Sequence, residues 1–141
     1  MAIFQGGVIS TEYNLMYELR VVTKFSAAHQ LTMVGSKCEN MHGHNWKIEV
    51  YVTGEKLDEG GVVMDFGEIK KHVAEIMSLF DHKYLNELDY FKQSQPSSEN
   101  IAYFVAAELQ QRIENTAVTV SRVTAWESDD ASATYIVDQT Q

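Results

Sequence analysis

Alternation of apolar and polar residues predicts two β-strands early in the chain. Residues 16–29, MYELRVVTKFSAAH, are rich in β-branched and aromatic side chains, and residues 45–54, NWKIEVYVTG, alternate almost strictly. The alternating apolar positions of the second stretch are Trp46, Ile48, Val50 and Val52. A period of two places such side chains on one face of a strand. Glycines at 54, 60 and 61 then supply turns, so we expect an antiparallel pair with one buried face.

Two later stretches have the 3.6-residue period of an amphipathic helix. The first spans residues 65–80, where Asp65 can cap the first turn, and the second is capped by Ser98. Their apolar positions are Phe66, Ile69, Val73, Ile76 and Phe80 in the first helix, and Ile101, Phe104, Val105, Leu109 and Ile113 in the second. The stretch between them, residues 81–98, has no clear period and indicates a long loop.

Two further strands close the chain, over residues 117–128 and 132–138, joined by the turn Asp-Asp-Ala. The resulting order, β-β-α-α-β-β, contains too few βαβ units for a parallel fold. It predicts an α+β fold, with an antiparallel sheet and both helices on one face. Residues 1–15 show no sustained period, so we expect them to form an N-terminal arm or irregular lead-in, and residues 16–141 to form a single domain.

Composition narrows the classes of function. The chain has 141 residues, 45% hydrophobic and 22% charged, as in an ordinary globular protein. No apolar run reaches the roughly 20 residues of a membrane-spanning helix, and no secretory signal is visible, so we expect a cytoplasmic protein without membrane contact. The net charge of −9 argues against nucleic-acid binding. An anionic small substrate would need local positive groups, such as Lys37, Lys83 or a metal ion.

The stretch CENMHGHNW, residues 38–46, holds two histidines that can share one ion. His42 and His44 point to the same side of a strand, and His29 lies beside them if the two strands pair antiparallel. Three imidazoles with an open fourth position are typical of catalytic zinc, whereas a closed set of four ligands is usually structural. The competing interpretation is a glycine-containing turn with solvated histidines. His29, as a candidate third ligand, favours the metal site over the turn.

Cys38 is the one cysteine of the chain and has three possible roles. It can be a fourth metal ligand, a buried structural thiol, or a base or nucleophile activated as the thiolate. Its position between Lys37 and Glu39 argues against simple burial, and a nearby cation would favour the thiolate. The local sequence does not choose among these roles.

Two more polar clusters are candidates for catalytic or substrate-binding roles. Asp81 and His82 follow the first predicted helix, and a carboxylate near an imidazole can orient it and raise its basicity; the alternative is a surface histidine beside a helix-terminal acid. Glu127, after Ala125 and Trp126, could accept paired hydrogen bonds from an amidine-like N–H edge. On local sequence alone, an exposed acid at a strand end is the favoured interpretation of Glu127.

Six motifs together carry a family resemblance: FSAAHQL, CENMHGHNW, VMDFGEIK, FDHKYLN, PSSEN and AWESDDASATY. In this order, they closely resemble the 6-pyruvoyltetrahydropterin synthase superfamily over nearly the whole chain beyond the arm. The pyruvoyl branch typically carries five residues between its cysteine and His-Gly-His. The 6-carboxytetrahydropterin synthases of queuosine biosynthesis carry three, as does this chain, with Glu39, Asn40 and Met41.

The resemblance implies a role for each candidate residue. His29, His42 and His44 match the family's zinc ligands, and Cys38 matches the catalytic cysteine, which is not a ligand. Asp81 and His82 match the pair that completes the catalytic set, donated to the cysteine's site by a neighbouring subunit. Glu127 matches the acid that anchors the pterin ring through its 2-amino and N3 hydrogens, contrary to the local interpretation. The family assembles into a barrel-forming trimer and often a hexamer, so the resemblance implies a homo-oligomer with shared active sites.

The resemblance also implies a reaction. The family substrate is 7,8-dihydroneopterin triphosphate, and the carboxy branch releases triphosphate and acetaldehyde to leave 6-carboxy-5,6,7,8-tetrahydropterin. Zinc is the expected cofactor, and the chain shows no dinucleotide-binding glycine fingerprint. Two alternatives stay open: a pyruvoyl-type synthase that eliminates triphosphate only, and a noncatalytic zinc- or pterin-binding module in which Cys38 closes a structural site.

Overall fold

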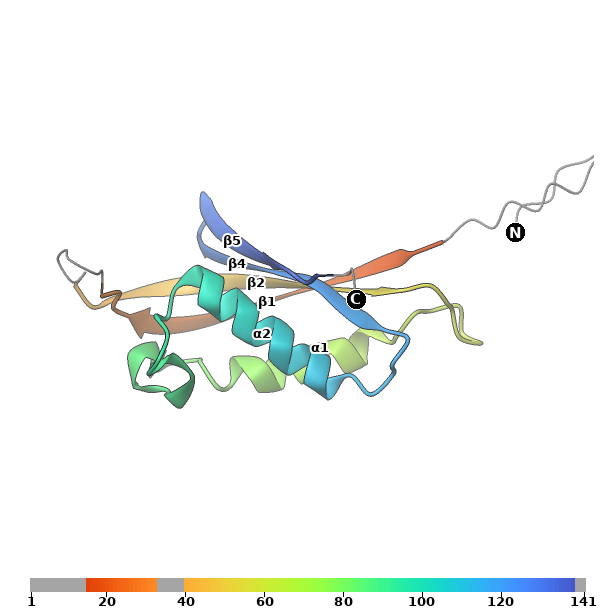
Figure 1. Ribbon diagram of the computed structural model, residues 1–141, viewed down its shortest axis with the longest axis horizontal. Coiled ribbons are helices and arrows are strands. Elements are labelled where there is room, and N and C mark those ends of the chain that lie inside the picture. The colour runs from red at the N-terminus through yellow and green to blue at the C-terminus, as the bar shows by residue number, and fades with distance from the viewer. Residues whose placement is uncertain (1–14, 33–39, 139–141) are drawn as a thin grey trace, which may run out of the picture.

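A computed structural model describes residues 15–32 and 40–138, and its elements follow the expected order. In chain order they are β1 (Tyr17–His29), β2 (His42–Gly54), α1 (Phe66–Met77), β3 (Lys83–Tyr84), the 3-10 helices η1 (Leu85–Glu87) and η2 (Asp89–Phe91), α2 (Ser98–Arg112), β4 (Thr119–Ser128) and β5 (Ala131–Ile136). The α+β fold class is therefore confirmed (Figure 1).

One five-stranded sheet forms the back of the molecule, in the order β3-β1-β2-β4-β5. β1 and β2 pair antiparallel without interruption, from Tyr17 opposite Gly54 to His29 opposite His42. β4 continues the antiparallel sheet on the other side of β2, and β5 pairs with β4. The short β3 pairs parallel with β1, which makes the sheet mixed where we predicted a purely antiparallel one.

Both helices cover one face of this sheet, as predicted, with α1 on β1 and α2 across β4 and β5 (Figure 1). Asp65 caps α1 by accepting a hydrogen bond from the Gly67 N–H. The cap of α2 is Ser97 and not Ser98, because the Ser97 hydroxyl accepts from the Asn100 N–H. Phe66 was also misplaced: as the first residue of α1 it is 50% exposed, because the helix has only begun to turn toward the sheet.

The stretch that we predicted to be a long loop, residues 81–98, contains β3 and two 3-10 helices. Its apolar residues anchor it, since Leu85 is fully buried and Phe91 nearly so. Short 3-10 turns carry no long period in the sequence, which is why the pattern indicated only a loop. The stretch therefore packs as part of the domain, next to the end of β1.

The core lies between the sheet and the helices. Phe25 stacks on Trp46 with ring centroids 5.1 Å apart and also contacts Phe80. The largest side chains that are buried there are Trp46, Phe80, Ile48, Ile69, Ile76, Leu85, Ile101 and Leu109. In the described residues, no helix is long and apolar enough to cross a membrane.

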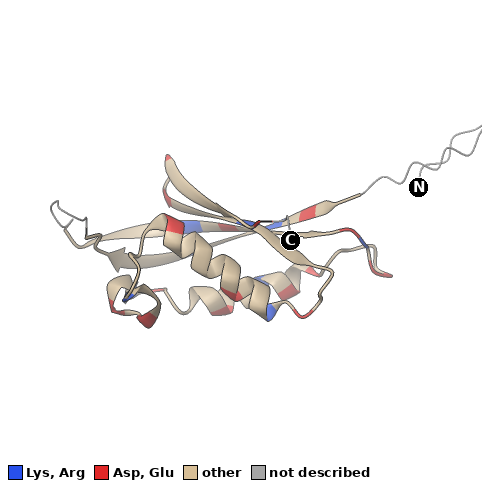
Figure 2. Ribbon diagram, in the orientation of Figure 1, with Lys and Arg blue, Asp and Glu red and all other residues tan. Residues whose placement is uncertain are grey.

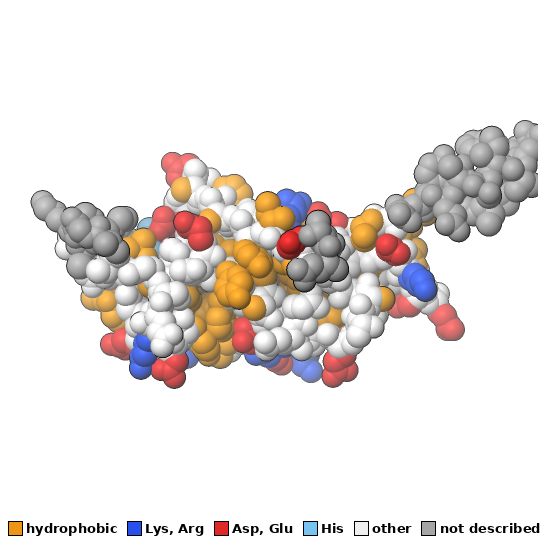
Figure 3. Space-filling view, viewed as in Figure 1, with side chains coloured by type: hydrophobic (Ala, Val, Ile, Leu, Met, Phe, Trp, Pro, Cys, Tyr) orange, Lys and Arg blue, Asp and Glu red, His pale blue; other side chains and the backbone are white. Residues whose placement is uncertain are grey.

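The two faces of the sheet differ in chemistry. Residues that alternate away from the helices are largely polar or charged, and include Arg20, Lys47, Glu49 and Arg122. Acidic residues are spread over helices, strands and turns (Figure 2). Hydrophobic side chains gather in the middle of the face that carries α2 (Figure 3). In α2, Tyr103 is 54% exposed. Of the predicted arm, residues 1–14 lie outside the described part, and Leu15 is exposed.

Candidate metal centre

Strand pairing brings three histidines together at one end of the sheet. His29 is the last residue of β1 and lies directly opposite His42, the first residue of β2, and His44 follows two positions later on the same side. The ring centroids of His29 and His42 are 4.6 Å apart, and those of His42 and His44 are 4.7 Å apart. The predicted convergence of the three side chains is therefore confirmed.

Backbone carbonyls orient two of these rings. The Nδ1 atom of His29 lies 2.7 Å from the carbonyl oxygen of Pro96, and that of His42 lies 2.7 Å from the carbonyl oxygen of Asn40. A carbonyl only accepts hydrogen bonds, so Nδ1 carries the proton in both rings and Nε2 of a neutral ring is left with a lone pair. The two Nε2 atoms face each other at 3.0 Å.

Two facing lone pairs at that distance repel unless a proton or a cation lies between them. Histidine ligands of metal ions are held in the same way, with the other ring nitrogen donating to a carbonyl or carboxylate. The arrangement of His29 and His42 thus fits a metal ion bound through Nε2, and His44 adds a third imidazole. Nitrogen donors of this kind suit zinc and neighbouring transition metals, not calcium or magnesium.

The walls of the site are buried and closely packed. His29 is completely buried, and its ring packs edge-on against Trp46 with centroids 4.9 Å apart. Trp46 also lies against the His44 ring at 5.1 Å and is itself fully buried in the core. Because Trp46 stacks on Phe25, the position of the histidines is tied to the packing of the whole sheet.

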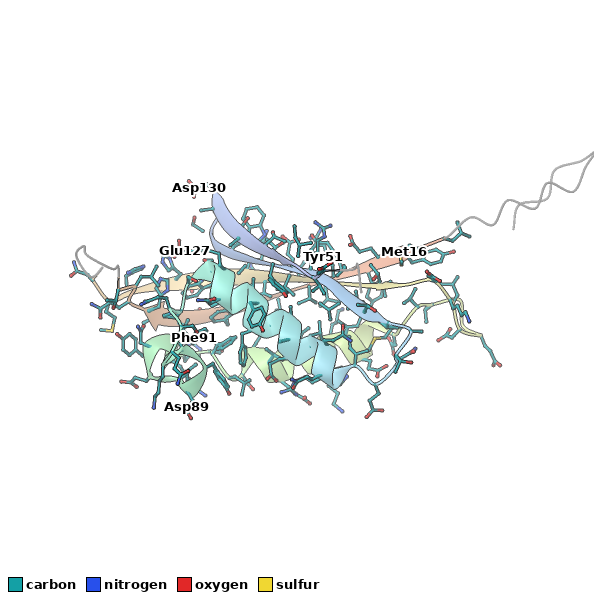
Figure 4. The ribbon with its side chains drawn as sticks, in the orientation of Figure 1. Met16, Tyr51, Asp89, Phe91, Glu127 and Asp130 are labelled. Carbon is teal, nitrogen blue, oxygen red and sulfur yellow. The ribbon has the colours of Figure 1, made fainter. Side chains whose placement is uncertain are left out.

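Glu127 supplies a carboxylate to the same group. It lies near the end of β4, at a register shift between Trp126 and Ser128 in the pairing with β5. Such β-bulges re-aim side chains next to functional sites. Glu127 Oε1 is 3.2 Å from His44 Nε2 and 3.4 Å from His29 Nε2. In Figure 4, Glu127 lies toward the end of the sheet opposite Met16. One ligand atom from each of His29, His42, His44 and Glu127 lies within 4.8 Å of the others.

Asp81 and His82 lie outside this group. The Asp81 carboxylate accepts a hydrogen bond from the Ser26 N–H at 2.9 Å, and its other oxygen is 3.6 Å from His82 Nε2. His82 has a φ of 59°, and its N–H donates to the Ser26 carbonyl. A left-handed backbone in a non-glycine residue is uncommon, although histidine is among the residues enriched there. The Asp81 carboxylate thus lies within ion-pair distance of the His82 ring but beyond hydrogen-bond length.

The His82 imidazole points toward solvent over a shallow cavity of about 440 Å³. The lining includes Ser26, Ala28 and Asn45, which alternate away from the helices, and Lys83. The three metal-site histidines share the other face of their strands with Trp46. His44 also borders the cavity and so links it to the metal group. Within one chain, the two sets of candidate residues thus lie largely on opposite faces of the sheet.

Cys38 and Lys37 lie outside the described residues, as does Glu39. Lys83, the other candidate cation for an anionic substrate, lines the same cavity as His82.

The residues that support His29 from behind were missed by sequence reasoning. The segment after β3 braces the end of β1: Asn86 exchanges two hydrogen bonds with the backbone of Gln30, at 2.8 and 2.7 Å. Gln95 accepts from the Thr32 N–H, and Pro96 provides the carbonyl for His29. Backbone carbonyls leave no trace in the residue types, so no local signal could have identified Pro96 or Asn40.

The fold and the site define an α+β protein with a histidine-rich candidate metal centre at one end of its sheet. The chain belongs to the 6-pyruvoyl tetrahydropterin synthase family, whose model matches residues 18–137. This confirms the superfamily resemblance found in the sequence.

Individual relatives agree with this assignment. A protein of Archaeoglobus fulgidus, provisionally named as a 6-carboxy-5,6,7,8-tetrahydropterin synthase, is 40% identical over 110 residues, 78% of this chain and 87% of its own. The 6-carboxy-5,6,7,8-tetrahydropterin synthase of a Synechocystis species is 39% identical over 62% of this chain and 70% of its own. The solved structure of Caenorhabditis elegans 6-pyruvoyl tetrahydropterin synthase superposes with a TM-score of 0.78 at 26% identity, covering 91% of this chain and all of the other.

Proposed function

We propose that the protein is a zinc-dependent 6-carboxy-5,6,7,8-tetrahydropterin synthase. It converts 7,8-dihydroneopterin triphosphate to 6-carboxy-5,6,7,8-tetrahydropterin, and releases acetaldehyde and triphosphate. The observation that carries the proposal is the set of three imidazoles, two of them with Nε2 lone pairs fixed toward each other, in a chain of the tetrahydropterin synthase family. The three-residue spacing between Cys38 and His42, and the similarity to relatives named for the carboxy reaction, favour this branch.

Each candidate residue has a physical role in this proposal. His29, His42 and His44 would hold a zinc ion, which would supply Lewis-acid polarisation of a side-chain oxygen of the substrate. Cys38, as the thiolate, removes or carries a side-chain proton. His82, oriented by Asp81, handles the matching proton, and its exposed position leaves it accessible to a substrate. The Glu127 carboxylate accepts the 2-amino and N3 hydrogens of the pterin ring as a paired interaction.

The proposal includes an oligomer with shared sites. His82 lines a cavity on the helix-free face, whereas the metal group lies on the helix-covered side of the strands. A neighbouring copy that presents its Asp81–His82 pair to the metal centre and Cys38 of the first copy would complete the catalytic set. Lys83, beside His82, would then approach the phosphates and offset the acidic charge of the chain.

The decisive experiment separates two branches of one family. Zinc-loaded protein is incubated with 7,8-dihydroneopterin triphosphate, acetaldehyde is assayed enzymatically, and the pterin product is identified by mass spectrometry. We expect acetaldehyde and 6-carboxytetrahydropterin in equal amounts. Triphosphate release with a pyruvoyl product and no acetaldehyde would instead establish the pyruvoyl-type reaction. A protein that binds zinc and pterin but does not convert the substrate would be the noncatalytic module.

We assign the reaction to queuosine biosynthesis in the cytoplasm. The test is complementation: the gene is expressed in a bacterium that lacks its own carboxytetrahydropterin synthase, and queuosine is measured in hydrolysed tRNA. We expect queuosine to return with the wild-type protein and to stay absent with the His42→Ala variant. Absence of queuosine with active wild-type enzyme would contradict the pathway assignment and leave the chemistry intact.

A further inference from the structure

The Glu127 carboxylate lies where a fourth ligand of the metal would be. In a tetrahedral site with ligand bonds of about 2.0–2.2 Å, two ligand atoms are separated by about 1.63 bond lengths, which is about 3.3–3.6 Å. Glu127 Oε1 is 3.2 Å from His44 Nε2 and 3.4 Å from His29 Nε2, and the His29 and His42 Nε2 atoms are 3.0 Å apart. These are three of the six edges of a tetrahedron of ligand atoms, and all four atoms lie within 4.8 Å of one another. The carboxylate oxygen is therefore at ligand spacing from two of the three histidines.

We propose that Glu127 is the fourth metal ligand of the resting protein and that it leaves the metal when it binds the pterin ring. This inference rests on the proposed function. A site closed by four protein ligands has no position for a substrate oxygen, whereas a catalytic zinc site keeps one open. Exchange of the carboxylate from metal to pterin would open that position only when a substrate ring is present.

The surroundings of Glu127 suit a movable ligand. Its side chain is 33% exposed, whereas that of His29 is fully buried and held by the Pro96 carbonyl. It also lies at a β-bulge near the end of β4, where the ladder to β5 is interrupted. The neighbouring residue is fixed instead, because the Trp126 indole N–H donates to Glu49 on the other face of the sheet. Glu127 can thus change partner while β4 stays in place.

The Glu127 carboxylate cannot bind the metal and pair fully with the pterin ring at the same time. Paired recognition of the 2-amino and N3 hydrogens uses both carboxylate oxygens, and one of them, Oε1, is the atom that lies among the histidines. Binding of the ring therefore competes directly with binding of the metal by Glu127. A pterin whose side chain carries no oxygen should therefore still change the coordination of the metal when its ring binds.

The first test measures zinc affinity of metal-free protein by competition with a chromophoric chelator. We expect Glu127→Gln to bind zinc about tenfold more weakly or worse, while Glu114→Gln, which removes the same charge from an exposed site after α2, keeps wild-type affinity. Circular dichroism of both metal-free variants checks that they fold. Wild-type affinity in Glu127→Gln would overturn the inference. A wild-type protein that binds no zinc would overturn the proposed function as well, so the two failures are distinguishable.

The second test uses cobalt in place of zinc, because its visible absorption reports the number and type of ligands. The probe is 6-methylpterin, which has the N–H edge of the ring but no side-chain hydroxyl. We expect this pterin to change the cobalt spectrum of the wild-type protein and to leave that of Glu127→Gln unchanged. If 6-methylpterin binds the wild-type protein, as shown by calorimetry, and the cobalt spectrum does not move, Glu127 is not a ligand that exchanges.

Discussion

His29 and His42 face each other across the β1–β2 ladder, with Nε2 atoms 3.0 Å apart and each Nδ1 atom on a backbone carbonyl. His29 is the last residue of β1 and His42 the first of β2, each a 13-residue strand, so their separation is set by the register of the β1–β2 pairing. A shift by one residue would turn one ring to the other face of the sheet.

This relationship predicts that His42→Ala removes the metal without removing the fold. The variant loses one nitrogen donor, and we expect its zinc content, measured by plasma mass spectrometry after dialysis, to fall from about one ion per chain to a small fraction. Added zinc should raise the melting temperature of the wild-type protein but not of the variant. His82→Asn is the matched control, because it replaces an exposed histidine outside the metal group and asparagine tolerates its positive φ. Equal zinc in His42→Ala and wild type would contradict the assignment.

Cys38 is expected to work beside the metal and not on it. We therefore predict that Cys38→Ala keeps full zinc occupancy, while its kcat falls by about 10²–10⁴-fold, the usual contribution of a positioned proton carrier. Zinc content and turnover are measured on the same preparation. Loss of zinc together with loss of the folded state would show instead that Cys38 closes a structural site.

The position of Asp81 and His82 predicts complementation between two inactive variants. If a site uses Cys38 of one subunit and His82 of another, co-expressed Cys38→Ala and His82→Asn chains form some sites with both residues intact. With random assembly, about a quarter of the sites are restored. We expect co-purified mixed oligomers to regain activity that neither variant shows alone. Separate purification followed by mixing without subunit exchange is the control, and no recovery in verified mixed oligomers would place both residues in one chain's site.

The sequence was sufficient to predict the histidine cluster because two simple periods determine it. Alternation in β2 puts His42, His44 and Trp46 on one face, and antiparallel pairing with β1 then leaves His29 opposite His42. The helices were found for the same reason, and Asp65 caps α1 as predicted. The errors are the cap of α2, which is Ser97 and not Ser98, and Phe66, which remains exposed. Regular periods are thus informative about faces but not about exact ends.

The contacts that hold the side chains of the site in place could not be predicted from the sequence. The carbonyls of Pro96 and Asn40 act through the backbone, and Asn86 binds Gln30 across a sequence separation of 56 residues. Glu127 is a related case. Its residue type suggested an exposed acid, whereas the β4 bulge places its oxygen 3.2 Å from His44. These relationships arise from tertiary packing, so the family resemblance was the one sequence signal that pointed to Glu127.

The brace behind His29 predicts an effect on metal affinity from a residue that is not a ligand. Asn86→Ala leaves the backbone N–H and carbonyl of Gln30 without their side-chain partner, which costs about 1–3 kcal/mol of stability. Because Gln30 follows His29 directly, we expect zinc affinity to fall as well, by about 10-fold. The control is Asn115→Ala, which removes a side-chain hydrogen bond to the Ala117 N–H at a turn before β4. Chelator competition and urea unfolding measure the two effects, and lower stability with unchanged zinc affinity would show that the brace supports only the fold.

The helix-free face of the sheet holds one buried carboxylate among the described residues, that of Glu49. Glu49 is 7% exposed and lies between Tyr51 and Trp126, whose O–H and N–H donate to it at 2.9 and 2.5 Å. Burial raises the pKa of Glu49, but these hydrogen bonds and the charges of Arg20 and Lys47 outweigh it, so the pKa lies below the ordinary value of 4.5. In the unfolded chain the pKa returns to that value.

The sign of the pH effect follows from this difference. The folded protein holds Glu49 ionised to lower pH than the unfolded chain does, so its contribution is present above about pH 4.5 and is lost as pH falls through the lowered pKa. We expect Glu49→Gln to lower the free energy of unfolding at pH 7 by about 1–2 kcal/mol, and we expect the gap to the wild type to narrow below pH 4.5. Urea unfolding at pH 7, 5, 4 and 3 measures the gap, with Glu114→Gln as the control. A gap that stays constant over this range would show that Glu49 has the same pKa in the folded and unfolded chain.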